Sequence, residues 1–506
     1  MELRLNDFDK AAGPLPLAGM RVLDLTRGIT GTIGRFLGEL GADVLRIEPP
    51  GGGSDRQEGP SAGGASLSFI AANLGKRAAT LDLCKPEDRK TLEALAGEAD
   101  VLIEASRPNS AQATALDVAG LRARWPALVT LSASDFGAGT YADWRATDAV
   151  LHALSGELSR SGIPGREPLL PPGELALQCA AAQAAYVVLV AYLARLQTGK
   201  GDHLDLSLLD GAVQALDPGF GMGGSATAGV PQSLLPRGRP EARHQYPIIP
   251  CKDGYVRLCI LAKRQWQGMF EWMGRPAEFA DPSFDDLRTR FASQTLIPAI
   301  TAFLADKSRA EVEAESQRYR VPAAAVLSLE EALETEHMRA RGAFTEVEVA
   351  PGIAAPLPNG AVVIDGARAG VRGPAPASDQ PAAAALAAWR EPRPALPAAG
   401  FGAPGRPLAG LRVLDLGVIV AGAEQGRLLA DFGAEVIKVE NAAFPDGARA
   451  SSAAGMSPGF AAGNRNKRGL GLNLRDPRGR DLFLRLAEQS DVVLSNFKPG
   501  VMASLG

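Results

Sequence analysis

The sequence predicts an α/β fold: a parallel sheet covered by helices, a second, smaller α+β domain, and a partial second copy of the large domain at the C-terminus. Three observations lead to this prediction. Strand-like apolar runs alternate with helix-like segments, the pattern changes after residue 210, and the opening of the periodic region recurs near residue 408.

The periodic region begins with a β-α-β unit. A strand is expected at 21–25, a helix at 32–40 and a second strand at 44–47, and further strands at 101–103 and 128–131 follow helix-like segments rich in Ala, Leu, Glu and Arg. Such alternation favours a parallel sheet with helical crossovers. Those two helix-like segments are 86–98 and 116–125, and a long apolar segment, 174–197, is expected to form one buried helix.

The segments after residue 210 predict a smaller α+β domain. Glycine-rich loops at 219–229 precede a short strand at 255–258 and helical segments through residue 317, whereas 351–365 is expected to return as strands to the large domain. The expected bounds are about 14–215 plus 345–375 for the large domain, about 220–340 for the small domain, 376–405 for a semi-rigid Pro/Ala-rich linker, and 406–506 for the start of the second copy.

The chain starts the same unit twice. Residues 17–25 and 408–416 differ at a single position, and the Gly41–Glu48 segment returns in related form at 433–440. The offset of 391 residues is far longer than a solenoid repeat, so a whole domain is duplicated. The second copy, as given, is incomplete.

The composition is that of a soluble globular protein. With 506 residues, 46% hydrophobic, 22% charged and a net charge of −4, the chain shows no basic excess of the kind that nucleic acid binding requires. Its four cysteines lack CxxC spacing, which argues against a metal site and fits a reducing compartment. No run of 18 uninterrupted apolar residues and no signal-peptide layout occurs, so we expect a cytoplasmic protein without a membrane partner.

Several motifs occur in one order. They are the Gly-Ala-Asp-Val-x-x-x-Glu strand ending at Glu48, the Asn-x-x-Lys-Arg segment from Asn73, the Phe-Gly-x-Gly turn from Phe136, and the Thr-Gly-Lys-Gly segment from Thr198. In this order they resemble the class III CoA-transferases of the CaiB/BaiF type, across most of 14–375 and 406–506. The resemblance implies a Rossmann-like large domain, an inserted small domain and two interlocked subunits, here as a tandem fusion with an incomplete second copy.

The resemblance also implies the chemistry. Family members transfer CoA from an acyl-CoA to a carboxylic acid through aspartyl anhydrides and an aspartyl-CoA thioester, with CoA thioesters as substrates and no permanently bound cofactor. The implied partners are therefore an acyl-CoA, a carboxylic acid, and an interlocked pseudo-dimer or homo-oligomer.

The catalytic aspartate of the family has no counterpart here. Counting forward from Gly173 places Gln178 at its position and counting back from Gly199 places Leu177 there, and the nearest acid, Glu174, lies about a helical turn away. Two hypotheses follow: a transferase whose nucleophile lies outside this sequence, or a non-catalytic CoA-binding or assembly half.

The resemblance carries CoA-binding positions over to both copies. Cys84 stands where the second copy has Arg475, and only an arginine donates charge-assisted hydrogen bonds to a phosphate, so the second copy is expected to be the better site. Buried core leucines and solvated arginines are the alternative interpretation of these positions. The implied residues are Ile29, Thr30, Leu81 and Arg145 in the first copy and Val420, Ala421, Leu472 and Arg475 in the second.

A nicotinamide-dependent oxidoreductase is a third hypothesis. The turn from Gly28 to Gly34 resembles but does not match the GxGxxG fingerprint, and Glu48 ends the second strand. The four histidines show no paired spacing with Ser, Cys or acidic residues and are interpreted as structural. Neither the racemase branch, which needs a His-Asp pair where this chain has Thr147 and Asp148, nor the glycine-rich oxalate branch is supported.

Overall fold

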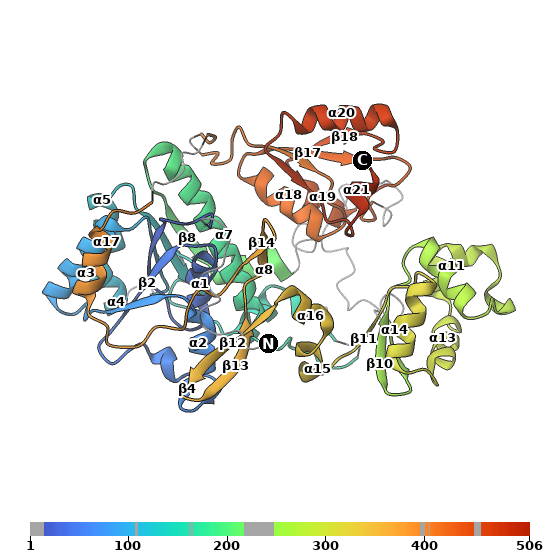
Figure 1. Ribbon diagram of the computed structural model, residues 1–506, viewed down its shortest axis with the longest axis horizontal. Coiled ribbons are helices and arrows are strands. Elements are labelled where there is room, and N and C mark those ends of the chain that lie inside the picture. Colours follow the sequence, from blue (N-terminus) through green and yellow to red (C-terminus); the bar gives the residue numbers. More distant parts are fainter. Residues whose placement is uncertain are drawn as a thin grey trace. The chain divides into compact units, whose positions relative to one another are not determined.

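The computed structural model describes residues 15–106, 110–159, 161–162, 165–216, 247–394, 400–403, 405–449 and 457–506. These residues form two compact units (Figure 1). The larger unit takes in the described parts of Met1–Glu157, Leu170–Pro236 and Ala343–Gly506, and the smaller unit those of Leu158–Leu169 and Arg237–Gly342.

The larger unit contains a six-stranded sheet in which every pairing is parallel, in the order β5-β2-β1-β6-β7-β8. The strand runs expected near 21–25, 44–47, 101–103 and 128–131 are all strands of this sheet. Its members are β1 (Arg21–Leu25), β2 (Asp43–Glu48), β5 (Arg77–Thr80), β6 (Val101–Glu104), β7 (Val129–Ser134) and β8 (His203–Ser207).

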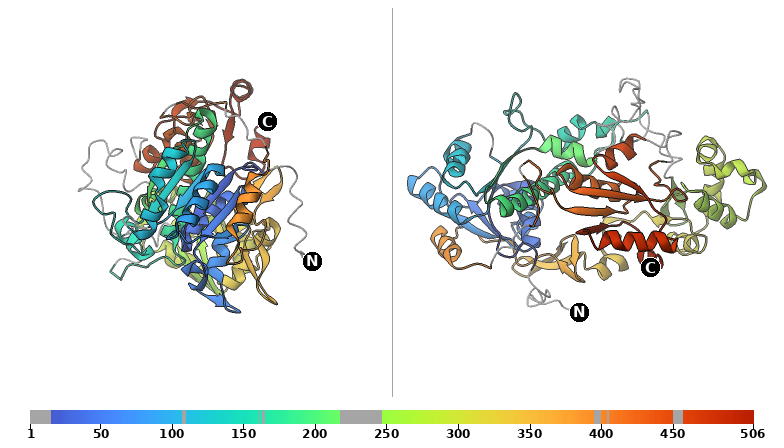
Figure 2. Two further views of the ribbon diagram at one scale, coloured as in Figure 1. Left: turned by 90° about the vertical axis from the view of Figure 1, so that its left-hand side faces the viewer. Right: turned by 90° about the horizontal axis from the view of Figure 1, so that it is seen from above.

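Helices cover both faces of this sheet (Figure 2). On one face, alanines of α7 and residues of α1 pack against Val22, Val44 and Val129, and on the other, α3 and α17 pack against Leu23, Leu45 and Leu102. The helices of this part are α1 (Gly31–Glu39), α2 (Leu67–Asn73), α3 (Pro86–Glu98), α4 (Ala111–Leu116), α5 (Val118–Arg124), α6 (Asp148–Leu154), α7 (Leu175–Thr198) and α8 (Leu208–Leu216), with the short strands β3 (Ser61–Ala62) and β4 (Ala65–Ser66).

The helix expected at 116–125 is α5, which begins two residues later, after Leu116 has ended α4. Asp117, between the two helices, has a left-handed backbone with φ 43°, and its side chain accepts a hydrogen bond from the Gly120 N–H (3.0 Å). The aspartate acts as the N-cap of α5, which a periodicity argument overlooks.

The long helix α7 meets the length and hydropathy of a membrane span, the single described helix to do so, and half of its most apolar window is buried inside the molecule. Ala180, Ala181, Ala184 and Val188 are fully buried. This burial is typical of a core helix, as the sequence predicted.

A second parallel sheet lies in the same unit, in the order β18-β17-β16-β19, with α18 to α21 around it. Its order matches that of β5-β2-β1-β6. Tyr186 of α7 donates a hydrogen bond to the Leu428 carbonyl (2.8 Å) of α18, and its ring packs on Phe432. The elements are β16 (Arg412–Asp415), α18 (Ala421–Asp431), β17 (Glu435–Glu440), α19 (Pro458–Asn464), β18 (Arg468–Gly471), α20 (Pro477–Ala487), β19 (Val492–Leu494) and α21 (Val501–Ser504).

The smaller unit is α+β. Its antiparallel sheet, β11-β10-β9, packs with its helices around Trp266, Met269 and Ile300. The expected glycine-rich loops at 219–229 lie outside the described residues. The elements are β9 (Ile248–Cys251), β10 (Gly254–Leu258), α11 (Lys263–Trp272), α12 (Leu287–Ala292), α13 (Leu296–Leu304), α14 (Arg309–Arg318), β11 (Ala323–Ala325), α15 (Leu329–Leu333) and α16 (Glu336–Arg341).

The chain then returns as two hairpins, β12 (Phe344–Ala350) with β13 (Ile353–Pro358), and β14 (Val362–Ile364) with β15 (Ala367–Ala369). These strands pair with each other and do not extend the six-stranded sheet, although Val347, Val349 and Leu357 pack against Phe69 of α2.

The segment expected to be a linker, 376–405, contains a packed helix. In α17 (Ala382–Arg390), Trp389 is 1% exposed and donates its indole N–H to Asp43 (2.7 Å). Alanine is the strongest helix former, so an Ala-rich segment with a large apolar anchor folds onto the sheet. Residues 395–399 and 404 of this segment lie outside the described part.

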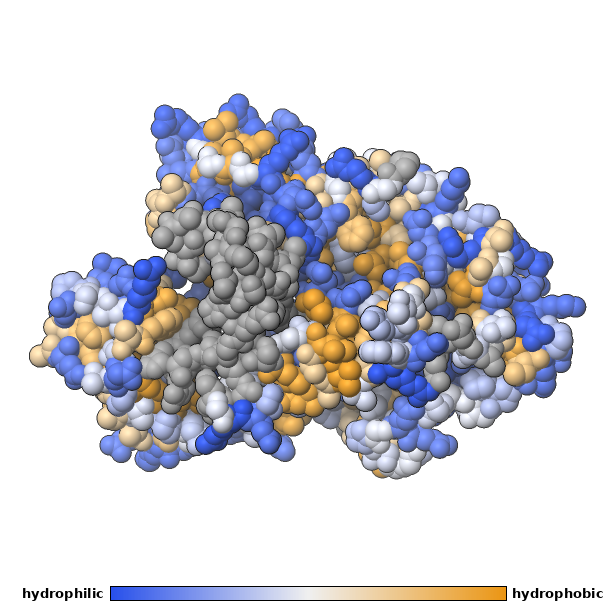
Figure 3. All heavy atoms as spheres, turned by 180° about the vertical axis from the view of Figure 1, so that it is seen from behind, coloured by the Kyte–Doolittle hydropathy of each residue, from blue (hydrophilic) through white to orange (hydrophobic). Residues whose placement is uncertain are grey.

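Large apolar side chains are also exposed on both units, among them Leu329 at 84% and Val420 at 66%. The face drawn in Figure 3 shows hydrophobic residues interspersed among hydrophilic ones. Single exposed apolar residues are normal on soluble proteins. Val420 lies in the turn between β16 and α18, which belongs to the candidate site described below.

Candidate functional site

The site begins with the turn that follows the first strand of each sheet. In the first sheet Gly28 has φ 56°, and in the second Ile419, at the same position of the repeat, has φ 60°. A β-branched residue in the left-handed region is strained by roughly 1–3 kcal/mol, so surrounding contacts must hold it there. Ile29 and Thr30 follow the first of these residues, and Val420 and Ala421 the second.

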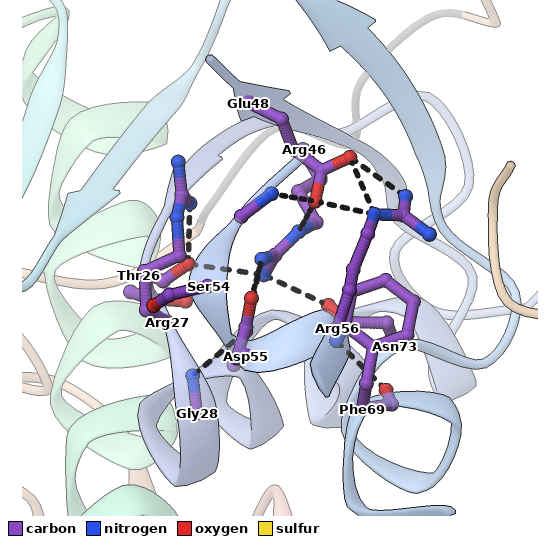
Figure 4. A network of polar contacts seen from close by, with 12 residues as sticks. Thr26, Arg27, Gly28, Arg46, Glu48, Ser54, Asp55, Arg56, Phe69 and Asn73 are labelled. Carbon is purple, nitrogen blue, oxygen red and sulfur yellow. Dashed lines mark hydrogen bonds and ion pairs between the residues drawn. The ribbon is translucent and has the colours of Figure 1, made fainter. Parts of the chain in front are cut away.

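A buried carboxylate holds each turn, and Figure 4 shows the one of the first copy. Asp55 accepts a hydrogen bond from the Gly28 N–H (2.8 Å), and Asp446 accepts one from the Ile419 N–H (3.0 Å). Both aspartates are almost fully buried, at 2% and 3% exposure. Because a buried carboxylate needs compensating charge, each also pairs with a basic residue of the neighbouring strand.

That basic residue is Arg46 in the first sheet and Lys438 in the second. Arg46 contacts Asp55 through Nη2 (2.7 Å) and donates to the Thr26 carbonyl (3.0 Å), while Lys438 contacts Asp446 (3.1 Å) and donates to the Gly417 carbonyl (2.6 Å). The two copies therefore build the same support for the turn from different side chains.

The strand-ending glutamate is engaged within the protein. Glu48 accepts hydrogen bonds from Arg46 Nε (2.9 Å) and from Arg56 Nη2 (2.6 Å), as drawn in Figure 4. Burial opposes ionisation, yet the hydrogen bonds from Arg56 and Arg46 hold the pKa of Glu48 below its ordinary value. A carboxylate occupied in this way does not fit the ribose-binding acid of a dinucleotide site.

A buried lysine lies beneath the first helix of each sheet. Lys76 donates to Asp24 (2.6 Å) and to the Gly31 carbonyl (2.6 Å) at the start of α1. Lys467 donates to Asp415 (2.7 Å) and to the Ala423 carbonyl (2.8 Å) in the same way. Both lysine side chains are therefore buried and each is paired with a buried carboxylate.

The structure brings two of the implied first-copy residues together. Thr30 and Arg145 line one cavity of about 540 Å³ at the carboxyl ends of β1, β6 and β7, together with Trp144. Ile29 is half-buried in the adjacent turn. Leu81, by contrast, is 4% exposed and belongs to the apolar core, so its side chain does not line this cavity.

The implied second-copy residues lie at the matching edge of the smaller sheet. Leu472 is half-buried against the core of that sheet, and its N–H donates to the Glu440 carbonyl (2.8 Å). Arg475 is exposed, and its guanidinium lies over the Phe444 ring at 4.4 Å. A cation beside an exposed aromatic face suits a phosphorylated aromatic ligand.

Cys84 occupies the same kind of turn as Arg475. The Cys84 N–H donates to Asp82 (3.1 Å), and the Arg475 N–H donates to Asn473 (3.1 Å). Cys84 is exposed and brings no positive charge to this position. The backbone is thus repeated while the side chain that could bind phosphate is present in the second copy alone.

Asn496 is a site residue that the repeat comparison missed. Its amide oxygen accepts from the Val418 N–H (2.9 Å) and its amide nitrogen donates to the Val418 carbonyl (3.0 Å). The matching position of the first copy is Ala105, which cannot make either bond. Because the two copies differ at this position, a search for residues that they share does not find Asn496.

The positions expected for the nucleophile lie in the first turn of α7. The Leu177 N–H donates to Asp148 (3.0 Å), and the Gln178 N–H donates to the Glu174 carbonyl (2.9 Å). Asp148 thus caps α7 from α6, a contact that the sequence did not suggest.

The histidines were interpreted as structural because none shows paired spacing with an acidic residue. For His152 that reason is wrong. This fully buried imidazole lies 3.3 Å from Asp148, four residues earlier on α6, and 3.0 Å from Glu157. The i, i+4 spacing of Asp148 and His152 was visible in the sequence.

Comparison with known proteins agrees with these features. The family model described as CoA-transferase family III matches residues 17–381 and 408–506. The protein named probable CoA-transferase Rv1866, from Mycobacterium tuberculosis, is 46% identical over 492 residues, covering 96% of this chain and 62% of that protein. This chain therefore spans less than two thirds of that relative's length.

Two further similarities concern single copies. Succinate–glutarate CoA-transferase of Agrobacterium fabrum is 29% identical over 68% of this chain and 89% of its own length. The crystal structure of a CAIB/BAIF family protein from Brucella suis aligns with a TM-score of 0.64 at 25% identity, covering 74% of this chain and all of that one.

Proposed function

Since the chain belongs to CoA-transferase family III, we propose that it takes part in the transfer of CoA from an acyl-CoA to a carboxylic acid. Relatives named for such transfers act on succinate and glutarate, on succinyl-CoA and L-malate, or on acetyl-CoA and oxalate. The observation that carries the proposal is the supported turn, in which Asp55 and Asp446 hold Gly28 and Ile419 at the same edge of two sheets.

The second copy is the better CoA site in this proposal. Val420 and Ala421 present backbone at the start of α18, and Arg475 over Phe444 offers a phosphate partner beside an aromatic face. Leu472 adds apolar contact. In the first copy Ile29, Thr30 and Leu81 are the corresponding positions, and Arg145, a further implied contact, shares a cavity with Thr30.

The chemistry needs a carboxylate. Its oxygen attacks the thioester carbon and the C–S bond breaks. The CoA thiolate is released, and an acyl–aspartyl anhydride is formed. The thiolate then attacks the aspartyl carbonyl, releasing the first acid and forming the aspartyl-CoA thioester, and the acceptor acid reverses these two steps. Since Leu177 and Gln178 carry no carboxylate, we place the nucleophile in residues outside this sequence.

A tandem, interlocked arrangement in the cytoplasm belongs to the same proposal. The matching strand orders of the two sheets and the contact of Tyr186 with Leu428 support two copies packed within one chain. The alternative function is a non-catalytic CoA-binding or assembly half, which the missing carboxylate favours.

Trapping on the full natural protein separates the two. Incubation with succinyl-CoA followed by borohydride or hydroxylamine should modify one aspartate, found by peptide mass spectrometry, if the protein is a transferase. A binding half forms no such adduct while still binding CoA, and that outcome would reject catalysis.

The location of the CoA site is tested separately by calorimetry with CoA. Arg475→Gln should weaken binding by about tenfold or more, because a charge-assisted contact is lost. Arg478→Gln, whose side chain is 89% exposed and pairs with Asp476, is the matched control. Equal affinities of the two variants would rule out Arg475 as a CoA contact.

A further inference from the structure

One face of the first sheet is polar where its last two strands meet. Thr130, Ser132 and Ser134 of β7 pair with His203, Asp205 and Ser207 of β8, so their side chains share a face. The alternating residues, such as Leu131 and Leu204, belong to the apolar core on the other face. Thr130 and Ser207 are buried, whereas His203 and Asp205 are exposed, so part of this face is open to a polar occupant.

A cavity of about 430 Å³ lies over this face, within the range of small-molecule sites. It borders the cavity of Thr30 and Arg145, with which it shares the lining residues Ser106, Ala133, Ser134 and Ala142. Its polar lining residues include Glu104, Ser106, Arg122, Ser132, His203 and Asp205.

Two of these groups lack a partner among the described residues. Ser106 is 9% exposed, and its hydroxyl makes no hydrogen bond with the described part of the chain. Arg122, on α5, lines the cavity without a hydrogen bond or ion pair to any described residue. A buried hydroxyl left unpaired is unfavourable, and a ligand that bonds to it would remove that cost.

The acceptors are fixed in place. Glu104, at 6% exposure, accepts from the Ser106 N–H (2.6 Å), and Asp205 accepts from the Ala138 N–H (2.9 Å), each through one oxygen. The other oxygen of each carboxylate has no hydrogen-bond donor in the described structure. The lining thus contains one guanidinium and two carboxylates.

His203 completes the wall as a neutral group. Its Nδ1 lies 3.0 Å from the Thr130 hydroxyl. Burial, followed by the positive charge of Arg122, lowers the pKa of His203 below its ordinary value, although Asp205 and Glu104 oppose this. The lowered pKa favours the neutral imidazole, so Arg122 and the two acids dominate the charge of the lining.

We propose that this cavity binds a small carboxylic acid that carries a hydroxyl or ammonium group beside its carboxylate. Arg122 pairs with the ligand carboxylate, Glu104 and Asp205 accept from its hydroxyl or ammonium, and the Ser106 hydroxyl completes the contacts. A plain alkyl acid would leave the two protein carboxylates without a donor, and a plain amine would leave Arg122 unpaired. The proposal concerns binding alone and does not depend on transferase activity.

The test is ligand-observed NMR and calorimetry on the full chain with three acids of similar size. D-Glycerate carries the hydroxyl, L-serine the ammonium, and propionate neither. We expect saturable binding of glycerate or serine, whichever donor the site takes, and at least tenfold weaker binding of propionate. Equal binding of all three, or binding of none, would overturn the proposal.

Variants locate the binding. Arg122→Gln should weaken the preferred acid by about tenfold or more, and Ser106→Ala should weaken it less. Arg124→Gln is the matched control, because it lies on the same helix, pairs with Glu93 (2.6 Å) and does not line the cavity. Thermal unfolding confirms that each variant is folded. If Arg122→Gln and Arg124→Gln bind equally well, the acid binds elsewhere and the proposal fails.

Discussion

Replacing Lys76 by methionine tests whether the buried ion pair of Lys76 with Asp24 stabilises the protein. The Lys76 ammonium is fully buried and donates three hydrogen bonds, to Asp24 (2.6 Å), to the Gly31 carbonyl (2.6 Å) and to Asn73 (2.9 Å). Methionine fills a similar volume without a charge, so the Asp24 carboxylate stays buried and loses its closest cation.

The magnitude follows from burial. Breaking a fully buried ion pair by removing one partner costs about 3–5 kcal/mol. The neighbouring pair of Arg77 with Asp43 (2.6 Å) is about 40% exposed on both sides, so Arg77→Met should cost no more than about 1 kcal/mol. The two adjacent substitutions thus differ in burial rather than in chemistry.

The assay is thermal unfolding followed by circular dichroism at pH 7. Lys76→Met should lower the melting temperature by on the order of 10 °C, and Arg77→Met by a few degrees at most. In the double variant Lys76→Met with Asp24→Asn, the loss should be smaller than the two single losses combined, because the unpaired charge is gone. A Lys76→Met chain as stable as the Arg77→Met chain would refute the reasoning.

Three further predictions follow from single residues. Burial opposes ionisation of Asp24, but the charges of Lys76 and Arg46 hold its pKa below its ordinary value of 3.8; this stabilisation is therefore present above pH 3.8 and lost as the pH falls through the lowered pKa. Unfolding curves between pH 7 and pH 2 should show that loss in the parent and less of it in Asp24→Asn. Gly268→Ala presses a methyl group against the Tyr319 carbonyl oxygen in the smaller unit and should destabilise it by about 1–3 kcal/mol in urea titration, and a neutral result would contradict the close packing. Ile419→Gly should raise the melting temperature, because glycine relieves roughly 1 kcal/mol of strain at φ 60°, whereas Val420→Gly, at the helix start, should not.

The turn shows how far sequence reasoning reaches into the site. The repeat of 391 residues aligns Gly28 with Ile419 and Lys76 with Lys467, and the structure places each pair in the same surroundings. Asp55 and Asp446 are also one repeat apart, yet nothing in the sequence says that their carboxylates accept from the turn. That contact joins residues 27 positions apart in each copy and depends on how the loop after the second strand folds back.

Other parts of the site depended on contacts that no pattern encodes. Leu81 and Thr30 were equal candidates in the sequence, but Leu81 belongs to the core while Thr30 lines a cavity. The sequence around Leu81 and around Thr30 does not tell which of them is buried, because burial at the end of a strand depends on which helix covers it. Here α3 and α17 cover Leu81.

The sequence by itself determined the alternation of strands and helices, the recurrence of the opening unit and the absence of a carboxylate at Leu177 and Gln178. Each depends on identity and spacing along the chain, which periodicity and repeat comparison measure directly. Tertiary structure alone decided which polar groups bond, such as Asp148 with the Leu177 N–H, and which line one cavity, such as Arg122 with His203 and Asp205. The reason is physical: hydrogen bonds and cavities form between groups that are distant in sequence, and their partners are set only when the helices pack on the sheet.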